Sequence, residues 1–259
     1  PSAAYYQLLP SYLQRNFPNN PEFAAGARDN FQSDGQIDWY SMYQRNIANA
    51  SRGLNSTYIY FEDRVDDKQW TFNTILNTEL NENIILNASL NYKSLKSENF
   101  AEVIDLLGGT GYLNVNGFDG VQNDLRNPNR IVGEGDKFSY NYNFYANTLS
   151  GYASALFKYN KLDFYLSANV SSTDYQREGF YENEANVGNS FGKGEKLTFT
   201  GFGAKGGLTY KITGKHLLDA NAGYIQRAPS LRNTFTNSRV NQDVVGIHDG
   251  VNITGKDIV

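Results

Sequence analysis

Apolar and polar residues alternate along several stretches of the chain from about residue 69 onwards. Between Ile84 and Lys93 one parity is apolar and the other is mostly polar, and the apolar set comprises Ile84, Leu86, Ala88, Leu90 and Tyr92. Because successive side chains of a strand point to opposite faces, this period of two predicts a strand with one apolar face. The same alternation over residues 69–80, 161–170, 202–212 and 218–224 predicts further strands of an antiparallel sheet.

Short polar connections separate these strands in pairs. Residues 81–83, a turn around Asn160, and residues 213–215 each predict a hairpin. The segment from Phe138 to Tyr159 is less regular, because its apolar positions are even at first and odd from Ala153 onwards. This change of phase predicts a β-bulge near residues 148–151.

Long polar loops alternate with the short turns. The loops cover residues 97–136, residues 181–196 and the stretch after Pro229. Outer-membrane barrels sort their connections in this way, with short periplasmic turns and long extracellular loops, and their polar face lines the lumen. A soluble β-sandwich with one face in water is the alternative, and it would need a second layer over the apolar faces. The loop pattern favours an all-β fold, an antiparallel transmembrane β-barrel with long extracellular loops.

The first part of the chain has a different amino-acid composition. Residues 1–53 are rich in aromatic, Asn and Pro residues and are predicted to be irregular and loop-rich, with a short helix near residues 38–43, whereas residues 54–259 carry the barrel strands and loops. If residues 55–61 form a full strand, Asp66, Asp67 and Lys68 form a hairpin tip and residues 1–50 lie on the periplasmic side. If residues 55–61 are only a projecting arm, residues 1–50 lie outside. The sequence leaves both open.

Composition narrows the possible functions. The 259 residues carry a formal net charge of −4 and no cysteine, which disfavours a nucleic-acid partner and excludes disulfides and thiol chemistry. No apolar run is long enough for a transmembrane helix, a finding compatible with a barrel because only one face of each barrel strand meets lipid. The chain begins without an initiating Met or a signal peptide, so we expect a mature form or an internal fragment.

Candidate chemical sites are weak. His216 and His248 lie far apart in the sequence and outside any ligand spacing, so no metal site is predicted from them. Asn114, Asn116 and Asp119 are typical either of a cation-binding loop or of an Asn/Gly turn cluster, and the turn is the favoured interpretation. We therefore predict no catalytic residue, no metal and no cofactor.

One segment resembles the TonB-dependent receptor family. The residues after Gly223 read GYIQRAPSL, with a Phe beyond them. Family members often carry an Arg-Ala-Pro step, then an apolar residue and Phe, at the outer end of a barrel strand; the matching residues here are Arg227, Ala228, Pro229, Leu231 and Phe235. Pro cannot donate to a central ladder, so it marks the point where strand pairing stops. Residues 5–12 (YYQLLPSY) and 175–179 (YQREG) are similar to the subgroup with an N-terminal carboxypeptidase-regulatory-like domain.

The resemblance implies that the chain is a piece of a 22-stranded barrel whose plug is not part of this sequence. It implies a receptor in the cell outer membrane, surrounded by its lipid bilayer. Such a receptor takes up a nutrient or metal chelate, is energised by a TonB-type complex through the plug, and has a surface lipoprotein as a further candidate partner. Four loop aromatics are candidate ligand contacts, although ordinary loop packing is equally open: Tyr112, Phe118, Tyr181 and Phe191.

Two other functions stay open. The first is a structural or adhesive outer-membrane barrel in a surface complex, which would lack a plug. The second is a barrel-rim hydrolase, which needs acids and His clustered at one rim. Asp66 and Asp67 do not supply such a pair, because adjacent residues on a strand point to opposite faces.

Overall fold

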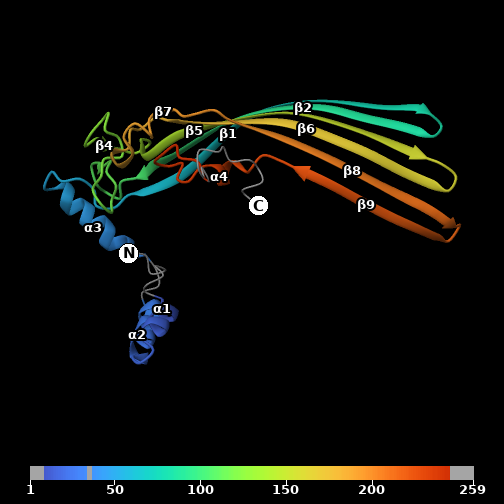
Figure 1. The fold of residues 1–259 in the computed structure, drawn as a ribbon. Helices are drawn as coiled ribbons and strands as arrows, with labels where there is room; N and C mark the ends of the chain where they lie inside the picture. Colours follow the sequence, from blue (N-terminus) through green and yellow to red (C-terminus); the bar gives the residue numbers. More distant parts are fainter. Residues whose placement is uncertain (1–8, 34–36, 246–259) are drawn as a thin grey trace. The chain divides into compact units, whose positions relative to one another are not determined.

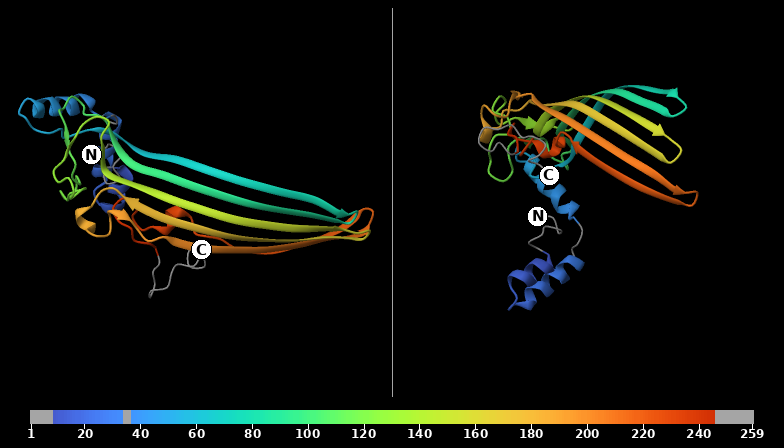
Figure 2. Two further views of the ribbon diagram at one scale, coloured as in Figure 1. Left: turned by 90° about the horizontal axis from the view of Figure 1, so that it is seen from above. Right: turned by 45° about the vertical axis from the view of Figure 1, so that its right-hand side comes forward.

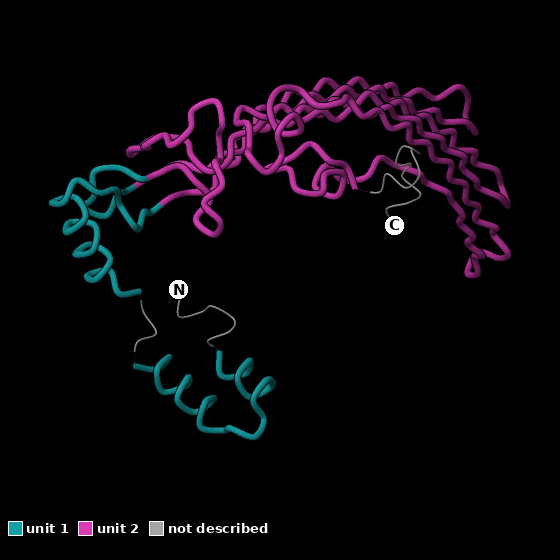
Figure 3. Tube along the Cα trace, turned by 60° about the vertical axis from the view of Figure 1, so that its left-hand side comes forward, with its two compact units in different colours: residues 1–60, 105–112 teal, residues 61–104, 113–259 magenta. Residues whose placement is uncertain are grey.

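The computed structural model describes residues 9–33 and 37–245. Its chain forms two compact units: the first contains the residues up to 60 together with residues 105–112, and the second contains residues 61–104 and those from 113 onwards (Figure 3). Antiparallel sheet dominates, with 52% of the described residues in strands, so the all-β class is confirmed.

The second unit is built on one antiparallel sheet (Figure 1). Its long strands, in both chain order and sheet order, are β1 (Tyr60–Asn81), β2 (Ile84–Asp105), β5 (Lys137–Lys158), β6 (Leu162–Gly179), β8 (Leu197–Thr213) and β9 (His216–Gln226). A short strand β7 (Gly192–Lys193) pairs with β6, while β3 (Tyr112–Leu113) and β4 (Ile131–Val132) form a separate two-stranded sheet. Short helices η2 (Glu184–Asn186) and α4 (Leu231–Thr234) lie in the connections. Within the described residues, β1 and β9 are the two edges of the long sheet.

The connections are sorted by length as the sequence predicted. Tight turns join β1 to β2, β5 to β6, and β8 to β9, and they gather at one end of the sheet (Figure 2). The long connections, residues 106–136 and 180–196, lie at the other end. We call these the turn end and the loop end.

The structure decides one alternative that the sequence left open, and it contradicts one local prediction. No hairpin tip forms at Asp66, because β1 runs unbroken through it. Arg64 pairs with Asp66 on the same strand (2.9 Å) and with Glu102 on the neighbouring β2 (2.8 Å), and the second ion pair holds this stretch to β2. The chain therefore enters β1 at the loop end. The predicted bulge is also absent, because β2 and β5 keep one register across residues 148–151. The irregularity lies instead at Ser139, whose φ is 61° and where the register with β2 shifts.

The hydrophobic core lies at the loop end of the sheet. The fully buried apolar side chains there come from β2, β5 and the connections: Phe100, Ala101, Val103, Val132, Phe138, Tyr140, Tyr142 and Phe144. Towards the turn end, large apolar side chains such as Leu166 (59% exposed) are not covered by other described parts of the chain. The two halves of the same strands therefore have different surroundings.

The first unit is helical rather than irregular, which corrects the prediction for residues 1–53. Its helices are α1 (Pro10–Asn16), α2 (Pro21–Ser33) and α3 (Trp39–Ala50). Pro10 and Pro21 stand at helix starts, where the missing N–H costs nothing, so the prolines that suggested coil are initiators. Asp38 caps α3 by accepting a hydrogen bond from the Ser41 backbone N–H at 2.9 Å. The predicted short helix is thus real, and it continues to Ala50.

Asn46 on α3 holds the first unit together. Its side chain is fully buried, and its Nδ2 donates to the carbonyl oxygens of Tyr58 (2.7 Å) and Leu106 (2.8 Å). Its Oδ1 accepts from the backbone N–H groups of Thr57 (2.9 Å) and Tyr58 (3.2 Å). The amide thus joins α3 to residues 57–58 and to Leu106. Both its donor and its acceptor atoms are hydrogen-bonded, so no buried polar group is left unpaired.

Candidate functional site

The strand register divides the turn-end half of the sheet into two faces. Residues paired across neighbouring strands lie on one face, as in the row Leu86, Ala155, Leu166, Gly206 and Ala222. We define the apolar belt as the face that contains this row. It takes the even positions of 84–92, 162–170, 202–212 and 218–224 and the odd positions of 149–157. Each of these positions holds an aliphatic, aromatic or Gly residue, and none is charged.

The size of the belt is its most informative property. On β2, β5 and β6 it covers stretches of nine residues, close to the ~9–11 residues with which a tilted strand crosses the hydrocarbon core of a bilayer. Its side chains are open to the surroundings, with exposed fractions of 59% for Leu166, 58% for Val170 and 50% for Phe202. Contiguous apolar surface of this extent is unusual on a water-soluble monomer and marks a contact surface.

The opposite face of the same stretch is mostly polar. We call it the polar face, and it includes Asn87, Ser89, Asn91, Ser150, Ser154, Ser167, Asn169, Ser171, Lys205 and Asn221. Glycines of β8 leave room for these side chains to lie flat: a Cβ at Gly203 would collide with the Asn169 side chain, and one at Gly207 with that of Asn221. The sheet therefore has one apolar and one hydrophilic side over the same length.

At the loop end the two faces exchange character. Tyr142 and Phe144 have the parity of the polar face, yet they are buried, with exposed fractions of 6% and 7%. Asn143 and Tyr145 have the parity of the belt and carry polar groups. This exchange, and not a bulge, explains why the apolar phase changes along β5.

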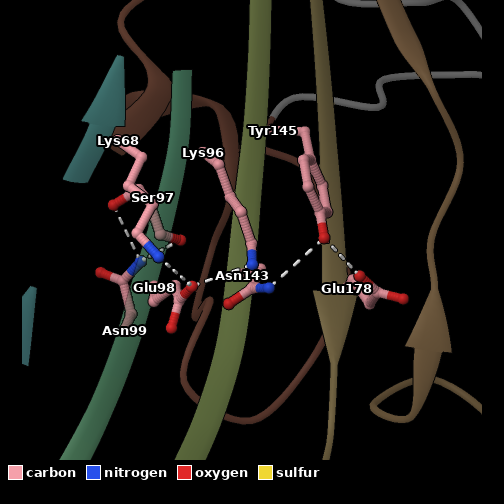
Figure 4. Close-up of polar contacts among 8 residues, drawn as sticks. All are labelled: Lys68, Lys96, Ser97, Glu98, Asn99, Asn143, Tyr145 and Glu178. Atoms are coloured by element: carbon pink, nitrogen blue, oxygen red, sulfur yellow. Dashed lines mark hydrogen bonds and ion pairs between the residues drawn. The ribbon is translucent and has the colours of Figure 1, made fainter. Parts of the chain in front are cut away.

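A polar network continues the belt face at the loop end (Figure 4). Lys96 pairs with Glu98 at 2.9 Å, and Lys68 approaches the same carboxylate at 3.8 Å. The hydrogen bond from Lys96 lowers the pKa of Glu98 below its usual value, and desolvation opposes the shift. The Tyr145 hydroxyl donates to Glu178 at 2.7 Å. The belt thus ends at this side in mixed charges and hydroxyl groups.

An arginine is the centre of the other face at the loop end. Arg177 is 2% exposed, and its Nε donates to the Ser238 carbonyl at 2.7 Å while its Nη1 donates to the Ser190 carbonyl at 2.9 Å. Its Cζ lies 5.0 Å from the centre of the Tyr142 ring. Burial lowers the pKa of the guanidinium to about 10, which leaves it charged at neutral pH. We call these four residues the arginine clamp; it joins β6 to both the 180–196 loop and the segment after β9.

Residues 175–179, singled out by resemblance, surround this clamp. The Tyr175 hydroxyl donates to the Pro229 carbonyl at 2.9 Å. A Cβ at Gly179 would collide with the Ser190 carbonyl oxygen, so the glycine allows that carbonyl to reach Arg177. Sequence reasoning assigned Arg177 no role, and its burial follows only from the contacts with Ser190 and Ser238.

The residues of the Arg-Ala-Pro step follow the end of β9. Pairing stops at Gln226, before the buried Pro229, as predicted. Arg227 is exposed and Ala228 is half-buried, while Leu231 begins α4. Phe235 is 7% exposed and packs on Phe144 with ring centres 4.9 Å apart. The step therefore leads the chain from the edge strand back over the face of β5 that carries Phe144.

A second cation was also missed by sequence reasoning. Arg239 pairs with Asp63 at 3.1 Å, and its Cζ lies 4.5 Å from the centre of the Tyr140 ring. The Tyr140 hydroxyl donates to the same Asp63 carboxylate at 2.7 Å. Burial, followed by this hydrogen bond, raises the pKa of Tyr140. The segment after β9 is thus anchored at both Ser238 and Arg239.

The four predicted ligand-contact aromatics have different surroundings. In the first unit, Tyr112 is half-buried at the start of β3. In the second unit, Phe118 is fully exposed, Tyr181 donates to the Lys137 carbonyl at 2.7 Å, and Phe191 is stacked by the Arg126 guanidinium at 4.3 Å. No ring contact joins the last three aromatics in the part of the chain that the structure describes. Phe118 is the one most available to a ligand.

The loop that resembled a cation site is made of turns. Asn116 Oδ1 accepts from the Phe118 N–H at 3.1 Å, and Asp119 Oδ1 accepts from the Val121 N–H at 3.0 Å. These bonds are those of Asx-turns, as the favoured interpretation predicted. Within residues 9–33 and 37–245, no group of three His, Cys, Asp or Glu residues is arranged to hold a metal ion. His248 lies outside the described residues.

Comparison with known proteins assigns the chain to no family. The chain matches no protein-family model, no curated protein and no solved structure. Among its described helices, none combines the length and the apolar character that spanning a membrane requires. The resemblance to TonB-dependent receptors therefore stays a prediction based on residues 5–12, 175–179 and 223–235. Of the first stretch, residues 5–8 lie outside the described residues and Pro10 begins α1.

Proposed function

We propose that this chain is part of the barrel of an outer-membrane receptor that takes up a nutrient or a metal chelate by TonB-dependent transport. The observation that carries the proposal is the apolar belt, an uncharged face nine residues long backed by a polar face of equal length. Lipid on one side and a hydrated lumen on the other would satisfy both faces at once.

The edges of the sheet support a barrel larger than this chain. β1 and β9 each lack a second neighbour among the described strands. An unpaired backbone group in hydrocarbon costs several kcal/mol, so a membrane sheet must close on itself. Further strands from the rest of the natural protein would close it, as in the 22-stranded barrels of the family that the sequence resembles.

The loop end supports a receptor. The long connections gather at this end of the sheet, and the arginine clamp fastens the 180–196 loop and the segment after β9 to the inner face. Rigid anchoring of loops at one mouth is what ligand capture requires, since binding residues concentrate on loops that a scaffold positions. Two of the three stretches that resemble the family take part in this anchoring, through Tyr175, Pro229 and Phe235.

The test is the intact mass of the natural protein extracted from outer membranes in detergent. We expect a mass several times the 29.1 kDa of this chain, with additional barrel peptides and a plug. Deleting the TonB-type energising protein should then abolish growth on the transported nutrient. A protein recovered in the soluble fraction, or one with a mass near 29.1 kDa, would contradict the proposal, and a large barrel without a plug would favour the structural or adhesive alternative.

A further inference from the structure

Asn116 and Gly117 form the only Asn-Gly pair in the chain. They belong to the long connection of residues 106–136, in a tight hairpin that is closed by a bridge between Val115 and Gln122. Gly117 is exposed and Asn116 is partly exposed, so water reaches both residues. Because glycine has no Cβ, its backbone nitrogen is the least hindered nucleophile that can follow an asparagine.

The hydrogen bonds of Asn116 fix its backbone and leave its reactive atoms free. Its N–H donates to the Val121 carbonyl at 2.8 Å, and its carbonyl accepts from the Gly120 N–H at 2.9 Å. Its side-chain Oδ1 accepts from the Phe118 N–H at 3.1 Å. In the part of the chain that the structure describes, neither the Gly117 N–H nor the Asn116 Nδ2 donates a hydrogen bond.

This arrangement suits an attack of the backbone on the side chain. The Asx-turn folds the Asn116 side chain back over the peptide that follows it, which brings Cγ towards the Gly117 nitrogen. The Phe118 N–H points at Oδ1, the atom that gains negative charge when Cγ is attacked, and a fixed donor stabilises that charge. The side-chain nitrogen is held by no acceptor and is free to leave as ammonia.

A second turn of the same kind provides a comparison within the hairpin. Asp119 is also followed by a glycine, and its Oδ1 accepts from the Val121 N–H at 3.0 Å. Here, however, the Gly120 N–H already donates to the Asn116 carbonyl. A carboxylate is also a poorer electrophile than an amide. Of these two turns, only that of Asn116 therefore combines a free nitrogen with a reactive carbonyl.

We propose that the Asn116–Gly117 pair is a site of spontaneous deamidation in the folded protein. The Gly117 nitrogen loses its proton to water and forms a bond to Asn116 Cγ. The bond between Cγ and Nδ2 breaks, and Nδ2 takes up a proton from water and leaves as ammonia. Water then adds to one of the two carbonyls of the cyclic imide, which opens to aspartate or isoaspartate at position 116.

Both products change the surroundings of Phe118. Each adds a carboxylate next to it, and the isoaspartate also lengthens the backbone by one atom between Asn116 and Gly117. The Asx-turn that holds the Phe118 N–H is lost in the isoaspartate, because Oδ1 becomes a main-chain carbonyl oxygen. The reaction would therefore alter the loop aromatic that is most available to a ligand. This inference goes beyond the proposed membrane barrel and does not rest on it.

Peptide mapping of the full-length natural protein by mass spectrometry tests the site. The folded protein is incubated at mildly alkaline pH, sampled over time and digested with trypsin. Residues 97–126 are released as one peptide, which contains three further asparagines as internal controls: Asn99, Asn114 and Asn123. Replacement of NH2 by OH raises the mass of this peptide, and fragmentation locates the change. Two samples are treated in parallel: the protein unfolded in urea, and Gly117→Ala, whose added methyl group obstructs the attacking nitrogen.

We expect conversion at Asn116 in the folded wild type at least as fast as in the unfolded chain, and its loss in Gly117→Ala. The three other asparagines of the folded peptide should stay intact. Conversion of Asn116 in urea alone would overturn the inference, because the folded loop would then protect the site. An unchanged rate in Gly117→Ala, or equal conversion at Asn114 or Asn123, would overturn it as well. Since none of these results depends on membrane insertion, the proposed barrel is tested separately.

Discussion

A matched pair of substitutions on β5 tests the proposal that the belt face of the sheet meets lipid. Ala153 lies in the middle of the belt stretch of β5, between Ala88 and Ala168 on the neighbouring strands. Ser154, the next residue, lies on the polar face between Asn87 and Ser167. The two side chains differ by one hydroxyl, so replacing each with Arg introduces nearly the same volume and charge on opposite faces.

The expected effects differ strongly. An arginine at the bilayer midplane on the lipid face costs about 2–4 kcal/mol, or about 30- to 900-fold in the folding equilibrium, whereas a lumen position tolerates it. Ala153→Arg should therefore destabilise by about 2–4 kcal/mol and Ser154→Arg by less than about 0.5 kcal/mol. At the edge of the belt, Leu149→Arg should lose less than Ala153→Arg, because the cost of the charge falls with distance from the midplane.

Equilibrium unfolding of the full-length protein in phospholipid vesicles measures these values, with tryptophan fluorescence as the signal. Equal costs at Ala153 and Ser154 would show that the belt face is not the lipid face. A higher cost at Ser154 than at Ala153 would reverse the assignment of the two faces. Either result would refute the interpretation of the belt.

Three further outcomes test the loop end. Arg177→Met should cost about 2–4 kcal/mol in urea unfolding and speed proteolysis of residues 227–245, because two buried carbonyls lose their donor; unchanged cleavage would contradict the clamp. Gly179→Ala should cost about 1–3 kcal/mol because its Cβ would meet a carbonyl oxygen. In the matched control Gly151→Ala, the added Cβ would lie 3.9 Å from its nearest neighbour, a methyl carbon of Val170, so we expect no loss of thermal stability. Folding lowers the pKa of Glu98, so the ionised carboxylate stabilises the folded protein above the ordinary pKa of 4.5. This stabilisation is lost as the pH falls through the lower pKa of the folded state. Glu98→Gln should therefore remove this part of the acid sensitivity in pH-dependent unfolding.

Much of the sheet could be predicted because its signal is local. Alternation with a period of two identifies a strand without any knowledge of its partners, and the turns near residues 81–83 and 213–215 are marked by Asn and Gly. The helices before β1 were missed for a local reason as well. Prolines such as Pro10 and Pro21 suggest coil when they are counted as composition, but they start helices when their position is considered.

The loop-end site could not be predicted because it depends on contacts between distant segments. Nothing near Arg177 in the sequence indicates that its guanidinium meets carbonyls at positions 190 and 238. The change of phase in β5 was visible, but a bulge and an exchange of faces give the same pattern in one strand. Only the register with β2 and β6 distinguishes them.

The exchange of faces also links the two halves of the sheet to one function. Along β5 the apolar side chains lie on the belt face at the turn end and on the opposite face at the loop end. The same strand therefore has different surroundings in its two halves. At the turn end its apolar side chains have no covering layer among the described residues. At the loop end Phe144 is covered by Phe235, which follows the edge strand. In the proposed membrane barrel, the strands would leave the bilayer at the level of this exchange, and the sequence of β5 would place the membrane surface just beyond Leu149.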